Sequence, residues 1–235
     1  MFKELLSLGS ALIKTKRKFS KLINASPGRA PKHKIYEGIL KFSEGAVRRM
    51  AGKAKIDVSI DLAYRLLHPR NTILVTCIGN DGKPNIITLA WSMPVSLNPP
   101  IVAISIAPKR YSHKLIEETK EFVINIPTME IVKETLYCGR VSGRNVDKFK
   151  ETNLTPAPAK KVKAPIIKEC IAHLECIVER QITAGDHTLF LGKVVAAYTN
   201  EGVFDETFDV RKAKLVYHLG GDAFATLGDE VIIPS

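Results

Sequence analysis

Two apolar segments on either side of Asn98-Pro99-Pro100 constrain the fold more than any other feature of this sequence. The first segment passes through residues 88–92, and the second runs from Ile101 to Ile106. Because an Asn-Pro-Pro sequence favours a tight reversal of the chain, the two segments are predicted to be antiparallel strands. A chain organised around such a reversal is expected to form an antiparallel sheet.

A cluster of cationic and polar side chains follows the second segment. Pro108 ends the predicted strand, since proline cannot donate a hydrogen bond to a sheet. A helix is predicted over residues 112–119, and around its start lie Lys109, Arg110, Ser112, His113 and Lys114. The free backbone N–H groups at a helix N-terminus favour a dianionic phosphate. Residues 88–113 therefore predict a cradle for a phosphorylated planar cofactor.

The other apolar segments predict further strands with short helices between them. A strand over residues 71–79 is expected to turn at Asn80-Asp81-Gly82-Lys83 into a partner over residues 86–91, because Asp-Gly accepts positive φ. Residues 169–182 alternate like a half-exposed strand, with His173 and Glu175 on its polar face. More strands are predicted over residues 122–127, 188–198 and 215–219. One helix is predicted over residues 61–67, capped by Asp61. Another is predicted over residues 128–138, capped by Thr128 and ended by Gly139.

These elements add up to about six antiparallel strands. No repeated strand–helix–strand rhythm is present, so a small closed barrel is favoured over a doubly wound sheet. The sequence has neither G-x-G-x-x-G after a strand nor G-x-x-x-x-G-K-[ST]. A nucleotide bound at residues 88–113 is therefore expected to be held by a fold other than the Rossmann or P-loop folds.

The excess positive charge is confined to the first part of the chain. Residues 1–55 hold fourteen Lys and Arg against three Asp and Glu, whereas residues 56–235 hold twenty-one of each class. We therefore predict two parts: a basic, helical extension with a linker over residues 1–55 and a globular domain over residues 56–235. The basic isoelectric point says nothing about the partners of the globular domain.

The basic extension has two readings. Leu5, Leu8 and Leu12 recur at near-helical spacing among lysines, which is typical of an amphipathic helix. Such a helix either docks on the body or on a partner subunit, or it binds an acidic partner or a membrane surface. Few aromatic residues interleave with its charges, so a nucleic-acid surface is not favoured.

The cysteines, His68 and the lack of membrane or signal segments predict a cytoplasmic protein without a metal site. The four cysteines, Cys77, Cys138, Cys170 and Cys176, form no C-x-x-C pair and are predicted to be free thiols, with Cys138 the one to watch for reactivity. No apolar run is long enough to span a membrane, and no cleavage pattern of a secretory signal is present. His68 has no partner at metal-ligand spacing and is expected to be a solvated loop residue.

Six stretches, taken in order, resemble the flavin reductase-like family of FMN-binding split barrels, which includes flavoredoxin. The resemblance covers about residues 63–226. The stretches are residues 85–91, 95–100, 107–114, 122–127 and 138–149, and Gly185-Asp186-His187 with Gly192-Lys193-Val194. It implies a six-stranded antiparallel Greek-key split β-barrel with short inserted helices, a homodimer, and FMN bound without a covalent link near the subunit interface.

The resemblance also implies roles for individual residues. The flavin would be contacted by Thr88, Leu89, Ala90, Trp91 and Ser92, and its ribityl phosphate would be surrounded by Ala107, Arg110, Ser112 and His113. Near the flavin or the partner subunit would lie Asn85, Ser142, Gly143 and Arg144. His187 would lie near the nicotinamide of NAD(P)H, and it is the one tentative catalytic residue.

Three functions are compatible with these features. The first is an NAD(P)H-dependent oxidoreductase that passes electrons through FMN to a flavin, a metal complex or a protein. The second is an FMN-binding electron carrier reduced by a partner protein. The third is a scaffold whose basic arm binds membrane or nucleic acid. The preference for NADH or NADPH and the final acceptor are left open by the sequence.

Overall fold

The computed structural model describes residues 55–234, of which residues from Val58 onward form one compact unit. The predicted basic helical extension therefore lies outside the described residues, apart from Lys55. None of the helices in the described part of the chain is both long and apolar enough to cross a bilayer.

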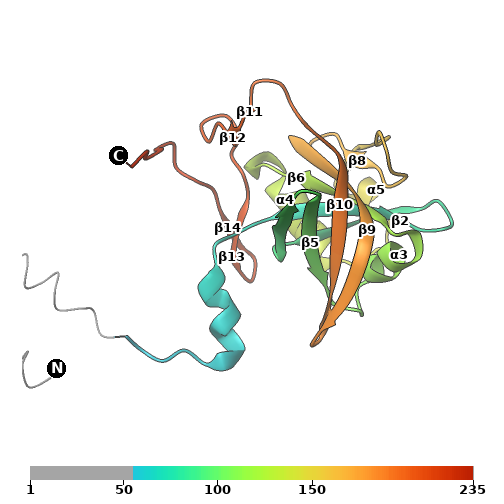
Figure 1. The fold of residues 1–235 in the computed structure, drawn as a ribbon, viewed down its shortest axis with the longest axis horizontal. Helices are drawn as coiled ribbons and strands as arrows, with labels where there is room; N and C mark the ends of the chain where they lie inside the picture. Colours follow the sequence, from blue (N-terminus) through green and yellow to red (C-terminus); the bar gives the residue numbers. More distant parts are fainter. Residues whose placement is uncertain (1–54, 235) are drawn as a thin grey trace, which may run out of the picture. The chain divides into compact units, whose positions relative to one another are not determined.

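The unit is organised around one antiparallel sheet of seven strands (Figure 1). The strand order is β3-β2-β6-β9-β10-β5-β4. Their bounds are β2 Ile73–Ile78, β3 Pro84–Leu89, β4 Ser92–Leu97, β5 Pro100–Ile106, β6 Glu121–Ile126, β9 Ala172–Ala184 and β10 His187–Thr199. The predicted antiparallel, mainly β architecture is thus confirmed.

Glycines with positive φ form two of the hairpin turns, the first of which is the one predicted at Asn80-Asp81-Gly82-Lys83. Gly82 joins β2 to β3 at φ 78°, and Gly185 joins β9 to β10 at φ 61°. Both lie in the left-handed region, which glycine adopts at little cost. The register that follows pairs Val75 with Ile87 and Leu189 with Ile182.

The single strand predicted through residues 88–92 is instead two strands. β3 ends at Leu89 and β4 begins at Ser92, so Ala90 and Trp91 form a break in the chain. The Arg70 guanidinium fixes this break, since its Nε donates to the Ala90 carbonyl at 2.8 Å and its Nη2 to the Ser92 carbonyl at 3.3 Å. β3 and β4 occupy the two ends of the strand order, and only two residues join them. The sheet must therefore curl until its edges approach each other, as in a barrel.

Short helices fill the connections. They are the 3₁₀ helix η1 Ile60–Leu67, α3 Tyr111–Thr119, η2 Met129–Ile131, α4 Val132–Arg140 and α5 Lys148–Thr152. Two predicted helix boundaries are wrong, since Ser59, not Asp61, precedes η1 and α4 continues through Gly139 to Arg140. Thr128 does precede the helical segment that begins with η2, as predicted, but its side chain makes no capping hydrogen bond. A Cβ at position 139 would stand 3.2 Å from Thr88 Cβ. Glycine at this position therefore lets α4 and β3 approach each other closely.

Small sheets complete the unit. β1 Arg70–Asn71 pairs with β13 Tyr217–Gly220, which pairs with β14 Ala223–Ala225. β7 Pro156–Ala157 pairs with β8 Ile166–Ile167, and β11 Phe204–Asp205 pairs with β12 Thr207–Phe208. The final strand predicted over residues 215–219 is thus part of a separate three-stranded sheet.

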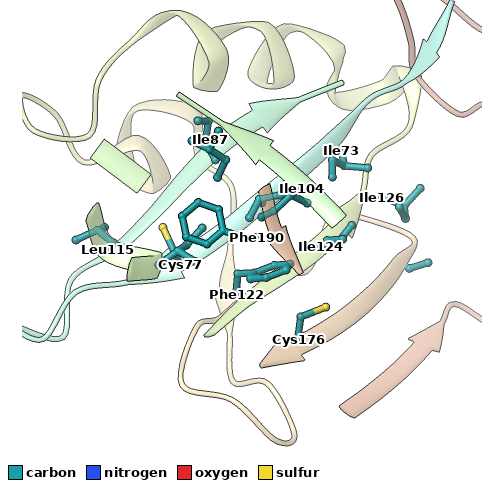
Figure 2. Packing of buried hydrophobic residues seen from close by; sticks show 14 of the residues in the cluster. Ile73, Cys77, Ile87, Ile104, Leu115, Phe122, Ile124, Ile126, Cys176 and Phe190 are labelled. Atoms are coloured by element: carbon teal, nitrogen blue, oxygen red, sulfur yellow. The ribbon is translucent and has the colours of Figure 1, made fainter. Parts of the chain in front are cut away.

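The core lies inside the curled sheet. Figure 2 shows Phe122 and Phe190 at its centre, surrounded by branched aliphatic side chains from several strands. Both rings are fully buried. Cys77 and Cys176 also belong to this cluster, as expected for small core residues. Burial of this apolar surface is the main force that closes the sheet.

The first part of the polar face predicted for β9 is buried, whereas Glu179 farther along the strand is exposed. His173 and Glu175 are 5% and 0% exposed. The Glu175 carboxylate accepts hydrogen bonds from the backbone N–H groups of residues 160–162, in the segment joining β7 to β8, and from the Tyr198 hydroxyl. Alternation along the strand therefore predicted its two faces but not that the polar face is covered around Glu175.

All four cysteines are free and buried, as predicted for thiols. The suspicion of a reactive Cys138 is wrong. Burial raises the pKa of Cys138 to about 11, so its thiolate is scarce at neutral pH. The same cause raises the pKa of Cys77 and of Cys176 to about 12.

Candidate functional site

A strongly cationic cavity of about 230 Å³ lies at the N-terminus of α3. Five cationic residues and no carboxylate line it: Lys109, Arg110, Arg140, Arg144 and Lys148. No side chain caps α3, so its first backbone N–H groups are available to an anion. The cavity lies at the helix start where residues 88–113 predict a phosphate cradle.

Asn85 and Ser112 form the floor of the cationic cavity. Both are buried, and Asn85 Nδ2 donates to Ser112 Oγ at 2.7 Å. Gly143 closes over Asn85, because a Cβ at position 143 would stand 2.0 Å from Asn85 Oδ1. The loop after α4 therefore requires glycine at this point. The cavity brings together four predicted residues from separate stretches of the sequence: Asn85, Ser112, Ser142 and Gly143.

Arg144 fixes this loop to the start of α3. Its Nη1 donates to the Lys109 carbonyl at 3.1 Å, and its guanidinium lies 5.2 Å from the centre of the Tyr111 ring. The Ser142 hydroxyl accepts from the Arg144 backbone N–H at 3.3 Å. Residues 142–144 thus form one wall of the cavity.

Lys148 is a site residue that the sequence did not single out. Its side chain is 5% exposed, although it lies in a stretch that reads as a solvated basic loop. Nζ donates to the carbonyls of Ile86 at 2.7 Å and Cys138 at 2.6 Å. Burial lowers the pKa of Lys148 to about 8, so the group is charged at neutral pH but titrates readily. The adjoining Phe149 was the only signal that this loop turns inward.

A second cavity, of about 270 Å³, is lined by backbone and aromatic rings. One wall is the predicted stretch Thr88, Leu89, Ala90 and Trp91 with Ala107. The rings facing it are those of Tyr64, His68, His187 and His218. Such a cavity suits a planar ring better than a flexible chain.

His187 lies where the sequence places it, at the rim of this aromatic cavity. Its Nδ1 donates to Asp186 Oδ1 at 2.7 Å. Its ring lies 4.9 Å from that of Trp91, tilted by 34°. The hydrogen bond from His187 and its charge hold the pKa of the exposed Asp186 below its usual range.

His68 is not the solvated loop residue expected from the sequence. Both of its ring nitrogens are shielded from solvent, and within residues 55–234 neither has a hydrogen-bond partner. Burial, with the nearby charges of His218, Arg70 and Arg65, lowers the pKa of His68. The imidazole is thus neutral at neutral pH.

The two cavities adjoin each other, since Ile87, Arg110 and Gly139 line both. One end is cationic and rich in N–H donors, and the other is aromatic. A ligand with a phosphate at one end and a planar ring at the other matches both ends, and FMN is such a ligand. In the described part of the chain, no group of three His, Cys, Asp or Glu side chains is arranged to hold a metal ion.

The sequence profile of the flavin reductase like domain matches residues 64–224. The chain belongs to this family. Flavin reductase-like relatives include an uncharacterised protein of Pyrococcus abyssi, 38% identical over 168 residues, which are 72% of this chain and 96% of the relative. Another is the flavin reductase (NADH) of Kitasatospora aureofaciens, 31% identical over 129 residues, which are 54% of this chain and 65% of the relative.

Solved flavin reductase-like structures share the fold. The flavoredoxin of Desulfovibrio vulgaris is 29% identical and superposes with a TM-score of 0.68, covering 77% of this chain and 96% of its own. The predicted family and split barrel are thereby confirmed. The predicted flavin cofactor and oxidoreductase class are confirmed at the level of the family.

Two predicted site residues of this flavin reductase-like chain line neither cavity. His113 is 7% exposed and turned into the core, where Nε2 lies 2.8 Å from Thr188 Oγ1 and its ring meets that of Phe190 edge-on. The first turn of α3 points its third residue toward the sheet, so His113 does not reach the phosphate cradle. Ser92 begins β4, beyond the break at Trp91, and only its backbone carbonyl is engaged near the site, by Arg70.

Proposed function

We propose that the protein is an FMN-dependent oxidoreductase that takes electrons from NAD(P)H and passes them to a flavin, a metal complex or a protein. The observation that carries this proposal is that the cationic cavity adjoins the aromatic one, with Ile87, Arg110 and Gly139 lining both. The cationic end fits the ribityl phosphate, and the aromatic end fits the flavin ring.

The phosphate would be held by the start of α3. Arg110 stands where both cavities meet, and Ser112 and Lys148 lie on the inner side of the cationic cavity. Backbone N–H groups of the first turn of α3 would add further donors. Asn85 would position Ser112, because its Nδ2 donates a hydrogen bond to Ser112 Oγ.

The ring would lie along the break between β3 and β4. There Thr88 to Trp91 present backbone groups to the aromatic cavity, and Arg70 keeps the break rigid through two carbonyls. When bound, FMN supplies the hydride and electron transfer. His187 would orient the nicotinamide from the rim, because Asp186 fixes its tautomer and Trp91 limits its tilt.

We also propose that the protein acts as a homodimer of the cytoplasm. Met93, Val95 and Leu97 on β4 are exposed, and so are Leu66 and Leu67 on η1. Apolar surface of this kind next to a ligand site is typical of a subunit interface. Contact of the basic arm with a membrane surface remains a proposal about residues outside those described.

The first test is the spectrum and redox chemistry of the purified protein. We expect a yellow protein with one FMN per chain that bleaches when NADH or NADPH is added without oxygen. A yellow protein that neither nucleotide bleaches would contradict the NAD(P)H step and leave an electron carrier reduced by a partner protein. A colourless protein that does not take up FMN would contradict the whole proposal and favour a scaffold.

A further inference from the structure

The cationic cavity holds more positive charge than one phosphate offsets. Five cationic side chains and no carboxylate line it. In residues 55–234, Arg140 alone among the five forms an ion pair, with Asp222. Four cations there are without a counter-charge: Lys109, Arg110, Arg144 and Lys148. The FMN phosphate carries about two negative charges, so two positive charges remain uncompensated after FMN binds.

The position of each cation shows which two are left over. Lys148 is buried and Arg110 lies where the two cavities adjoin, so both suit the FMN phosphate at the start of α3. Lys109 and Arg144 are exposed at the rim of the cavity, where a second ligand can reach them from solvent. Like charges that gather at one place repel each other, and a bound anion relieves this repulsion.

Arg144 is already fixed in place to bind an anion. Its Nη1 donates to the Lys109 carbonyl at 3.1 Å, and its guanidinium lies 5.2 Å from the centre of the Tyr111 ring. A guanidinium has five N–H donors, so most of them remain available to a ligand. Because these contacts already order the side chain, little rotamer freedom is lost when it binds an oxyanion. Lys109 and Arg144 together are called the rim site below.

Lys109 lies between the rim site and the aromatic cavity. Ala107, two residues before it, lines the aromatic cavity. The hydrogen bond from His187 and the charge of His187 are the main causes of the lowered pKa of Asp186, and the charge of Lys109 adds to them. Lys109 is therefore close to the Asp186-His187 pair. A ligand that places a planar ring beside His187 can extend from there to the rim site.

We propose that Lys109 and Arg144 bind the 2′-phosphate of NADPH. The nicotinamide enters the aromatic cavity beside His187, and the adenosine half reaches the rim site. The 2′-phosphate carries about two negative charges and so matches the two uncompensated cations, whereas NADH has a neutral hydroxyl at this position. The inference rests on the proposed function, and it gives that oxidoreductase a preference for NADPH over NADH.

The test is calorimetric binding of NADP⁺ and NAD⁺ to the oxidised, FMN-loaded protein, in which no redox reaction occurs. We expect the wild-type protein to bind NADP⁺ about tenfold more tightly than NAD⁺, the effect of one charge-assisted hydrogen bond. Lys109→Met and Arg144→Met should each weaken NADP⁺ binding about tenfold and leave NAD⁺ binding nearly unchanged. The two residues lie on separate segments, so if one variant does not fold the other still decides.

Lys114→Met is the matched control, because Lys114 lies on α3 but pairs with Glu118 and lines neither cavity. Its affinities for both nucleotides should equal those of the wild type. An equal loss of NAD⁺ and NADP⁺ binding in Lys109→Met would place the pyrophosphate, which both nucleotides share, at the rim site and would overturn the inference. A loss of FMN affinity in both rim variants would also overturn it, since the rim site would then hold the FMN phosphate.

These failures differ from failure of the proposed function. A protein that retains FMN and binds NAD⁺ and NADP⁺ equally contradicts this inference alone. A protein that retains FMN but binds neither nucleotide contradicts both the inference and the NAD(P)H step. A protein that never retains FMN contradicts the whole proposed function.

Discussion

Arg110 is the residue at which the phosphate and ring ends of the site meet. Replacing it with alanine removes a charge-assisted hydrogen bond to the phosphate, so we expect FMN binding to weaken by about 1.5 to 3 kcal/mol. Titration of the FMN-free protein with FMN measures this. Riboflavin lacks the phosphate, and its affinity should change little.

The control for Arg110 is Lys114→Ala. Lys114 lies on the same helix but pairs with Glu118 on the surface and lines neither cavity. Its loss should leave FMN affinity unchanged. Equal FMN affinity in Arg110→Ala and wild type would mean that the phosphate is bound elsewhere.

Lys148 gives the FMN affinity a pH dependence. The pKa of Lys148 is about 8 without ligand, and a phosphate dianion favours its protonated form. FMN binding should therefore weaken as the pH rises through 8, by about tenfold between pH 7 and 9. Riboflavin affinity over the same range is the comparison, and Lys148→Met should remove the difference. An equal pH dependence for both ligands would exclude Lys148 from the phosphate site.

At the scale of the element, β10 can pack across β9 and β6 only because residue 192 is glycine. A Cβ at Gly192 would stand 2.6 Å from Phe122 Cζ and 3.0 Å from Cys176 Cβ, and the Phe122 ring is fully buried and unable to move aside. Gly192→Ala should lower the free energy of unfolding by about 1 to 3 kcal/mol. Urea unfolding measures this, and Gly228→Ala, with open space around it, should be neutral. Equal urea-unfolding midpoints for Gly192→Ala and Gly228→Ala would show that the core around Phe122 rearranges to accept the added methyl group.

Two carboxylates hold the segment between β7 and β8: Glu175 accepts from the backbone N–H groups of residues 160–162, and Glu121 accepts from those of residues 163 and 164. Burial alone would raise the pKa of Glu175, but hydrogen bonds from the Lys160 backbone, the Tyr198 hydroxyl and two more N–H groups hold it below its usual value. A lowered carboxyl pKa stabilises the fold above the unfolded value near 4.5, and this stabilisation is lost as the pH falls below it.

Glu175→Gln should therefore cost about 1.5 to 3 kcal/mol at pH 7 and less at pH 3. Thermal unfolding across this range measures the effect. Glu179→Gln on the exposed part of the same strand is the control. A cost that does not change with pH would mean that the carboxylate charge plays no part.

At the scale of the whole molecule, the basic arm and the barrel are expected to be separable. Residues 56–235 carry no net charge and contain every residue that lines the two cavities. Removing residues 1–55 should leave FMN content and the dimer mass unchanged, as measured by absorbance and light scattering. Loss of the dimer on removal would mean that the arm is part of the subunit interface.

Local signals predicted much of this molecule. Asp81-Gly82 specifies a tight turn because glycine adopts positive φ at little cost, and the apolar segments on either side of it have the length of strands. Arg110 and Ser112 were found because a helix start with cationic neighbours is a local pattern. The order of these patterns along the chain sufficed to suggest the family.

The tertiary structure alone decided which polar residues are buried and which histidines meet. Lys148, Glu175 and His68 read as solvated on the sequence, because periodicity describes a segment and not what covers it. His113 and Arg110 are three residues apart, yet one points into the core and the other into the site. His68 and His218 are separated by 150 positions and become neighbours through the pairing of β1 with β13. Burial and long-range contact arise from packing between distant segments, so no local pattern encodes them.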